Sequence, residues 1–173
     1  MALVIGTTFP RILTYFPESI ASHLFNAGRN VRLSIPFCVG YALVLAGATI
    51  RVLCYRRLRD RFTFDLAIRK DHALETGGMY SVVRHPAYIG SLLFIGGTYI
   101  CTCDGQSLLA AFGVWETSWG RAFHSFMVGS ALLAVYVFVD RTHVEDRALQ
   151  QQFGEQWVTW ARRTPYKLIP FVF

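Results

Sequence analysis

Three long apolar runs constrain what this chain can fold into more than any other feature. Residues 34–50 read SIPFCVGYALVLAGATI, residues 86–103 read PAYIGSLLFIGGTYICTC, and residues 122–139 read AFHSFMVGSALLAVYVFV. None of them contains Asp, Glu, Lys or Arg, and each approaches the roughly 20 residues that a helix needs to cross a bilayer. Because backbone polar groups in lipid must be paired within the segment, these runs predict transmembrane helices. The first extends to about Tyr55 if Arg51 snorkels to the interface.

The composition supports a membrane protein and excludes an ordinary soluble domain. Of the 173 residues, 53% are hydrophobic and only 16% are charged. The formal net charge of +6 does not indicate nucleic acid, because the basic residues gather beside the apolar runs. We predict a single domain over residues 1–173, an all-α integral membrane helical bundle with at least three transmembrane helices and the lipid bilayer as its partner.

Charged residues at the ends of the runs predict their orientation. Seven basic residues lie within residues 51–70, a density that the positive-inside rule places in the cytosol. Arg84 precedes the second run and Arg141 follows the third. The chain segments around Arg84 and Arg141 are therefore expected on the same, cytosolic side of the membrane.

The segments outside the three runs carry weaker signals. Residues 1–34 mix apolar pieces with prolines and charges, which fits either an interfacial helix or a short, imperfect span. Residues 106–119 are too short to cross alone and hold two tryptophans where an outer aromatic belt is expected. The four cysteines show no CxxC spacing, so we expect neither a metal site nor a required disulfide. Small residues within the runs, among them Gly47, Gly96, Gly97 and Gly129, allow close helix contacts.

The pattern changes after Arg141. Leu149, Phe153, Trp157 and Trp160 recur at spacings of three and four, with acids and amides on the other faces. This spacing predicts a C-terminal amphipathic cytosolic helix that Pro165 ends. The apolar residues of the following tail, YKLIPFVF, are expected to pack either against protein or at the membrane interface.

The stretch from Tyr80 to Gly90, YSVVRHPAYIG, places polar and ring-bearing groups directly before an apolar run. The triplet Arg84, His85 and Pro86 has an ordinary interpretation, because proline favours the first turn of a helix and arginine often marks a cytosolic span end. Tyr80 and Tyr88 also fit an interfacial aromatic belt. Together with His85, however, they supply flat faces and hydrogen-bonding tips at a helix N-terminus, which suits a nucleoside-like cofactor.

Arg141 and Glu145 are four residues apart on the predicted third span's cytosolic side. As a helix ion pair they would contribute only about 0.2–0.5 kcal/mol, and arginine first is the less favourable order. At a membrane boundary, Arg141 can instead hold an anionic acceptor through two parallel hydrogen bonds, while Glu145 can offset a cationic ligand. The functional interpretation is therefore favoured, with both stretches facing one site.

The two motifs, TGGMYSVVRHPAYIG and RTHVEDRALQQQFGEQWVTWARRTPYKLIPF, resemble the isoprenylcysteine carboxyl methyltransferase family. The resemblance covers residues 71–173, the expected catalytic core. The family pattern R-H-P-x-Y-x-G is intact from Arg84 to Gly90, whereas R-x-x-x-E-E occurs with Asp146 as its second acid. Trp157 and Trp160 replace two tyrosines of the family, so no catalytic role is expected of them.

The resemblance implies S-adenosylmethionine as cofactor and assigns roles to individual residues. Arg141 would address the acceptor carboxylate and is the expected catalytic and substrate-binding residue. The cofactor contacts that the resemblance implies are His72, Leu74, Tyr80, His85, Pro86, Ala87, Tyr88 and Glu145. The acceptors would be prenylated protein or peptide C-termini, and the implied location is the endoplasmic reticulum, with the oligomeric state left open.

Three alternatives remain beside methylation of a prenylcysteine α-carboxylate. A phospholipid amine N-methyltransferase would use the same cofactor and a similar membrane site. An NADPH-dependent membrane sterol reductase is indicated by the tail RRTPYKLIPFVF alone. A non-catalytic membrane adaptor is the third, since the N-terminal region is shorter than in eukaryotic family members.

Overall fold

The computed structural model describes residues 32–58 and 73–173, and all regular structure in these ranges is helical. The predicted all-α fold is confirmed. In chain order the elements are α3 (Ile35–Leu58), η2 (Gly78–Ser81), α4 (Pro86–Cys103), α5 (Leu108–Ala111), η3 (Val114–Glu116), α6 (Ser118–Phe153) and α7 (Glu155–Arg163).

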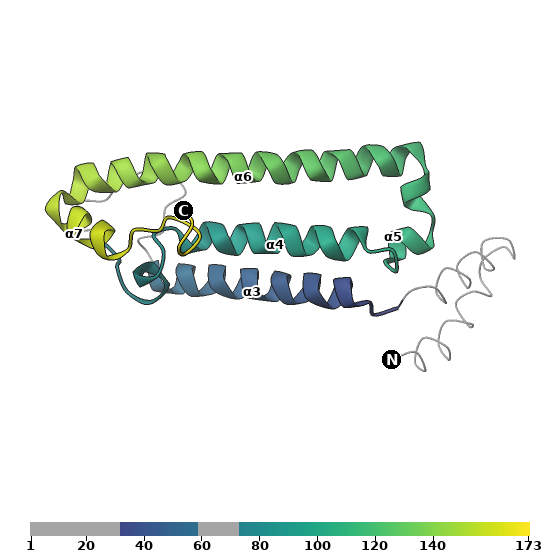
Figure 1. Ribbon diagram of the computed structural model, residues 1–173, viewed down its shortest axis with the longest axis horizontal. Helices are drawn as coiled ribbons and strands as arrows, with labels where there is room; N and C mark the ends of the chain where they lie inside the picture. Colours follow the sequence, from purple (N-terminus) through teal and green to yellow (C-terminus); the bar gives the residue numbers. More distant parts are fainter. Residues whose placement is uncertain (1–31, 59–72) are drawn as a thin grey trace, which may run out of the picture.

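Three helical stretches are long and apolar enough to cross a membrane, as predicted: α3, α4 together with α5 (Pro86–Ala111), and α6. They run alongside one another, with α4 between α3 and α6 (Figure 1). Helix α4 has the bounds that the charge-free run predicts, because Pro86 suits its first position and Asp104 follows its last. The chain is an integral membrane protein.

Helices α3 and α4 touch backbone to backbone at two glycine pairs. A Cβ added at Gly97 would lie 2.5 Å from the Gly40 carbonyl oxygen, and one at Gly47 would lie 2.4 Å from the Gly90 carbonyl oxygen. Both pairs are seven residues apart on each helix, so the antiparallel helices meet along one stripe. In lipid the hydrophobic effect does not hold helices together. The close backbone approach at the glycines instead allows van der Waals packing between α3 and α4.

Side chains join the same two helices at both ends. The Ser34 hydroxyl donates to Asp104 Oδ2 over 2.6 Å where α4 ends. Near the start of α4, the Arg51 guanidinium donates to the Ser91 hydroxyl and to the Tyr55 hydroxyl. We call this second end, where α4 begins, the site end of the bundle. Arg51 thus directs its guanidinium to hydrogen-bond acceptors within the protein rather than to lipid.

Helix α6 is longer than the membrane requires. Its 36 residues extend for about 54 Å at 1.5 Å per residue, against a hydrocarbon layer of about 30 Å. Thr117 caps it by accepting a hydrogen bond from the Gly120 amide. Because its apolar run ends at Val139, the last turns of α6 extend beyond the hydrocarbon layer.

The helical prediction for the segment after Arg141 holds, but its boundaries differ. Residues 141–153 continue α6 without a break, and α7 begins only at Glu155. Gly154 separates the two helices with φ +49°, a left-handed value that favours glycine. No glycine or proline lies between Ala131 and Phe153, which is why the change in composition at residue 140 does not end the helix. The chain leaves α7 before Pro165, as expected.

The remaining segments are divided between the two ends of the bundle. Two short turns, α5 and η3, connect α4 to α6 there (Figure 1). Helix α7 and the tail residues 164–173 lie at the site end, close to the start of α4 (Figure 1). The prediction for the N-terminal region concerns residues 1–34, of which residues 1–31 lie outside the described part of the chain.

Candidate active site

The site is built at the first turn of α4. His85 is the N-cap residue, but its ring makes no capping hydrogen bond and is available for other contacts. Its backbone is fixed by the tail instead, since the Arg84 amide donates to the Tyr166 carbonyl and the His85 amide donates to the Lys167 carbonyl, each over 2.9 Å. The tail therefore holds the RHP motif in place.

The His85 ring lies between two carboxylates from α6. Its Nε2 is 3.0 Å from Asp146 Oδ1, and its Nδ1 is 3.3 Å from Glu145 Oε2. Two acceptors on opposite ring nitrogens favour the doubly protonated imidazolium. Burial opposes that charge, but the hydrogen bonds to Asp146 and Glu145 outweigh it and raise the pKa of His85. The sequence motifs on α4 and α6 thus meet directly.

Glu145 joins the two predicted motifs. The Tyr88 hydroxyl donates to Glu145 Oε1, and Arg141 Nε lies 3.7 Å from the same oxygen. The Tyr88 ring stacks between its neighbours, 5.9 Å from the His85 ring and 5.0 Å from the Phe138 ring. About a quarter of the Glu145 side chain remains exposed, so its carboxylate is accessible to a ligand.

Asp146 is the most heavily paired acid of the site, and sequence reasoning gave it no role. Besides His85, it lies 3.5 Å from Arg84 Nη2 and 3.5 Å from Lys167 Nζ. It is buried, as are the ring of His85 and most of Arg84. Burying an acid requires paired charges. The sequence signal that could have identified Asp146 as a site residue is its position directly after Glu145 in the R-x-x-x-E-D pattern.

An apolar cluster supports the polar one. Cys54 of α3, Tyr80 and Trp160 form its buried centre, and Leu74 and Ala87 pack against it. The Trp160 indole N–H donates to the Tyr80 carbonyl over 3.0 Å, which gives this tryptophan a structural role. Burial, together with the neighbouring Cys54 thiol, raises the pKa of Tyr80. Its phenol therefore stays protonated.

The structure brings most of the predicted site residues together, in two adjoining groups. His85, Tyr88, Glu145 and Arg141 form the polar group, and Leu74, Tyr80 and Ala87 belong to the apolar cluster. Pro86 is buried as the first residue of α4. His72 lies outside the described residues. The contribution of the tail through Lys167 was not predicted.

A model of the phospholipid methyltransferase family matches residues 35–126, a little over half of the chain. The chain belongs to the phospholipid methyltransferase family. Members of such a family transfer a methyl group from a donor. The matched range includes α3, α4 and the RHP motif, and it stops before Arg141.

Curated relatives confirm the resemblance to isoprenylcysteine methyltransferases. The chain is 30% identical to protein-S-isoprenylcysteine O-methyltransferase B of Arabidopsis thaliana over 136 residues, which are 77% of this chain and 58% of the relative. It is 31% identical to the Homo sapiens protein-S-isoprenylcysteine O-methyltransferase over 77% of this chain and 40% of the relative. The chain thus spans about three fifths, or less, of these relatives. No solved structure matches.

Proposed function

We propose that the protein uses S-adenosylmethionine to methylate the C-terminal prenylcysteine α-carboxylate of lipidated proteins or peptides, or a related lipophilic acceptor. The observation that supports this most is the contact of Glu145 with Tyr88, His85 and Arg141 at the end of the apolar spans. A lipid-bearing anion from the bilayer and a water-soluble cation would meet at such a place. The cytosolic face of the endoplasmic reticulum is the proposed location.

The residues present fit the proposed cofactor. S-adenosylmethionine carries a cationic sulfonium and a nucleoside, and it would find the partly exposed Glu145 carboxylate beside the Tyr88 ring. Of the three buried side-chain donors without an acceptor among the described residues, Arg84 Nε and Trp157 Nε1 lie at the site end, and Trp115 Nε1 lies at the opposite end. Orphaned buried donors are rare in native proteins and are commonly paired by a ligand or water. The two at the site end could serve a polar ligand.

Each residue of the polar group then has a distinct task. When bound, the cofactor supplies a methyl group made electrophilic by the sulfonium charge. His85 and Tyr88 orient the Glu145 carboxylate, which balances the cofactor's positive charge. Arg141 binds the acceptor carboxylate through two parallel hydrogen bonds. His72, Leu74, Tyr80, Pro86 and Ala87 would shape the nucleoside side of the site.

This arrangement favours a carboxylate acceptor over an amine. A carboxylate is already ionised near neutral pH, whereas an amine must first lose a proton. The cluster offers an arginine to the acceptor, and its histidine is held as an imidazolium, which is not a base. Catalysis would rest on positioning and on exclusion of water, since both reacting charges diminish as the methyl group moves.

The test is transfer of labelled methyl from S-adenosylmethionine to N-acetyl-S-farnesylcysteine by purified protein in bilayers. We expect transfer, and we expect Arg141→Ala to reduce it about 100-fold while cofactor binding persists. Arg147→Ala, an exposed arginine on the same helix, is the matched control and should leave transfer unchanged. Unchanged transfer by Arg141→Ala would show that the acceptor binds elsewhere.

The same preparation separates the alternatives. Label appearing in lipid headgroups rather than in the prenylcysteine analogue would indicate a phospholipid amine methyltransferase. Binding of NADPH without binding of S-adenosylmethionine would indicate a reductase. Failure to bind either would leave a membrane adaptor.

A further inference from the structure

The tail residues 164–173 form a folded structure with an exposed apolar tip. Residues 169–172 make a turn closed by the Val172 amide, which donates to the Ile169 carbonyl over 3.1 Å. Pro170 occupies the second position and Phe171 the third, with φ +66° at Phe171. This is the geometry of a type II turn, in which the third position normally requires glycine.

The two faces of this turn differ sharply in exposure. Leu168 is only 3% exposed and fastens the turn to the protein, whereas Phe171 is 87% and Val172 77% exposed. Ile169 is also more than half exposed. The positive φ at Phe171 costs backbone strain in any medium. Exposure of its ring to water adds a second cost, which a lipid environment would remove.

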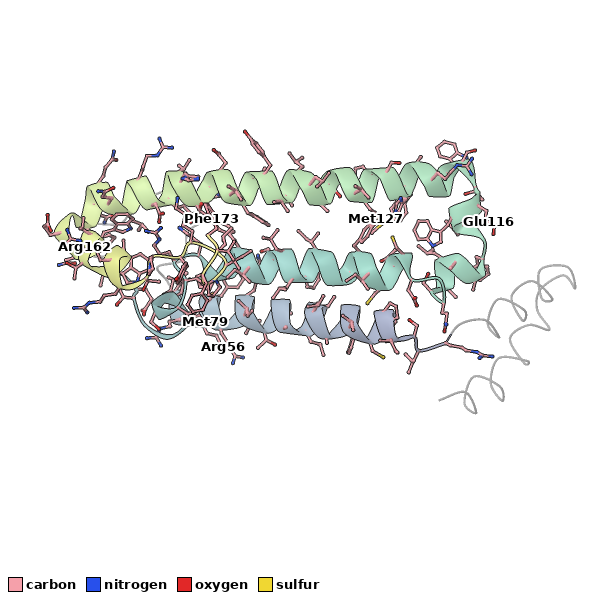
Figure 2. The ribbon with its side chains drawn as sticks, viewed as in Figure 1. Arg56, Met79, Glu116, Met127, Arg162 and Phe173 are labelled. Carbon is pink, nitrogen blue, oxygen red and sulfur yellow. The ribbon has the colours of Figure 1, made fainter. Side chains whose placement is uncertain are left out.

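The position of the tail identifies the medium around the turn. Its carbonyls accept from the amides of Arg84 and His85, directly before the apolar run of α4. On the other side, the ring of Phe173 lies 6.1 Å from that of His143, one turn beyond the apolar run of α6. Figure 2 shows Phe173 between α4 and α6. The turn therefore lies at the level where two membrane spans end.

The chemistry of the tip matches a lipid interface rather than hydrocarbon or water. The Tyr166 and Phe171 rings lie 5.2 Å apart, and Lys167 Nζ is 5.5 Å from the Phe173 ring centroid. Aromatic rings beside a cation are typical of segments at the headgroup level. We infer that the tip of the tail, Ile169, Phe171 and Val172, inserts into the headgroup and acyl boundary of the bilayer on the site side.

Insertion would also hold the site together. Lys167, two residues before Ile169, pairs with Asp146 at 3.5 Å and with His143 Nδ1 at 2.7 Å. The tail thus connects the membrane surface to the network around His85. The inference does not depend on the proposed methyl transfer, since its test uses neither cofactor nor acceptor.

The test places a tryptophan at the tip and measures its quenching by lipid. The Phe171→Trp variant is reconstituted in phosphatidylcholine vesicles whose acyl chains carry bromine near the headgroup, and the emission of the four native tryptophans is subtracted using wild type. We expect the added emission to fall about twofold or more. Gln151→Trp, on an exposed part of α6 beyond the apolar run, should show almost no quenching.

Two further variants control for the possibility that the Phe171→Trp substitution disturbs the turn. Val172→Trp should be quenched like Phe171→Trp, because both side chains are exposed on the same tip. Phe171→Gly removes the ring and leaves a glycine, which adopts φ +66° without strain. If the ring anchors the tail in the bilayer, its loss should loosen the hydrogen bonds from the Arg84 and His85 amides to the tail. Amide hydrogen exchange at Arg84 and His85 should therefore accelerate in bilayers. If neither tryptophan is quenched more than that of Gln151→Trp, the tip faces water or another protein molecule and the inference is wrong.

Discussion

Helix α4 has two neighbours, and it contacts them in opposite ways. Against α3 it packs through backbone, with the Gly40 and Gly97 pair and the Gly47 and Gly90 pair in direct approach. Against α6 it relies on side chains at the two ends, through the Tyr88 ring on Phe138 and the Tyr99 hydroxyl bound to His124 over 2.7 Å. The apolar middle of α6 is largely exposed in the described chain.

The difference assigns distinct tasks to the two contacts. Backbone packing between α3 and α4 allows little adjustment, because backbone atoms of one helix lie directly against the glycines of the other. It makes a fixed platform for the RHP motif. The contact of α4 with α6 depends on charges and hydroxyls, which also form the candidate site. Disrupting the first contact should therefore affect stability, whereas disrupting the second should affect both stability and binding.

The largest effect is expected at the charged contact between α4 and α6. Asp146→Ala removes a buried acid and leaves Arg84, His85 and Lys167 beside one another, a change that typically costs about 3–5 kcal/mol. The free energy of unfolding in mixed detergent measures this cost. Asp140→Ala, an exposed acid on the same helix, is the control and should change stability little. Equal effects of both variants would mean that Asp146 does not hold α6.

The glycine contact should give the next largest effect. Gly97→Ala would place a methyl group 2.5 Å from the Gly40 carbonyl oxygen, and overpacking of this kind costs about 1–3 kcal/mol. Its neighbour Gly96 has no atom within 4 Å of an added Cβ, so Gly96→Ala should be neutral or stabilising by about 0.5–1 kcal/mol. Thermal unfolding of the two variants compares them directly. A destabilised Gly96→Ala with an unchanged Gly97→Ala would contradict the helix packing.

A smaller effect, on binding rather than stability, is expected at Tyr88. Tyr88→Phe keeps the ring stacked on Phe138 but removes the hydroxyl that donates to Glu145. The lost hydroxyl leaves the Glu145 carboxylate less firmly oriented toward the proposed cofactor, so affinity for S-adenosylmethionine should fall roughly tenfold by calorimetry. Tyr99→Phe removes the hydroxyl contact at the other end of α4 and should leave that affinity unchanged. An equal loss in both variants would point to a general loosening of α4 against α6.

The smallest expected effect is the pH dependence that His85 adds to stability. The folded state raises the pKa of His85 above its ordinary value near 6.5, because Asp146 and Glu145 face its ring nitrogens despite its burial. The stabilisation is therefore fully present below about pH 6.5 and is lost as pH rises through the raised pKa. Unfolding midpoints measured on either side of neutrality should fall with pH in wild type. His85→Gln, which cannot titrate, should flatten that slope, and a persistent slope would assign it to another group.

Much of the site could be predicted from the sequence, because its two motifs are local patterns. Pro86 after a charged residue and before an uncharged run identifies the start of α4, and the spacing of Arg141 and Glu145 places both on one helical face. The partners of Asp146 could not be predicted, since Lys167 reaches it from a tail segment without helical or strand periodicity. The glycine pairs between α3 and α4 could not be predicted either, because many small residues lie in the spans. Only the three-dimensional contact distinguishes Gly97 from Gly96.

The sequence by itself determined that three apolar runs are long enough to cross a membrane and which residues carry charge at their ends, because hydrophobic length and backbone pairing in lipid allow few other outcomes. The break at Gly154 was not predicted, because the spacing of Phe153, Trp157 and Trp160 fits one continuous helix. Only the tertiary structure decided that His85 lies between two acids and that the tail reaches the start of α4. Those contacts join residues more than 50 positions apart, and nothing in a local pattern encodes how distant segments meet.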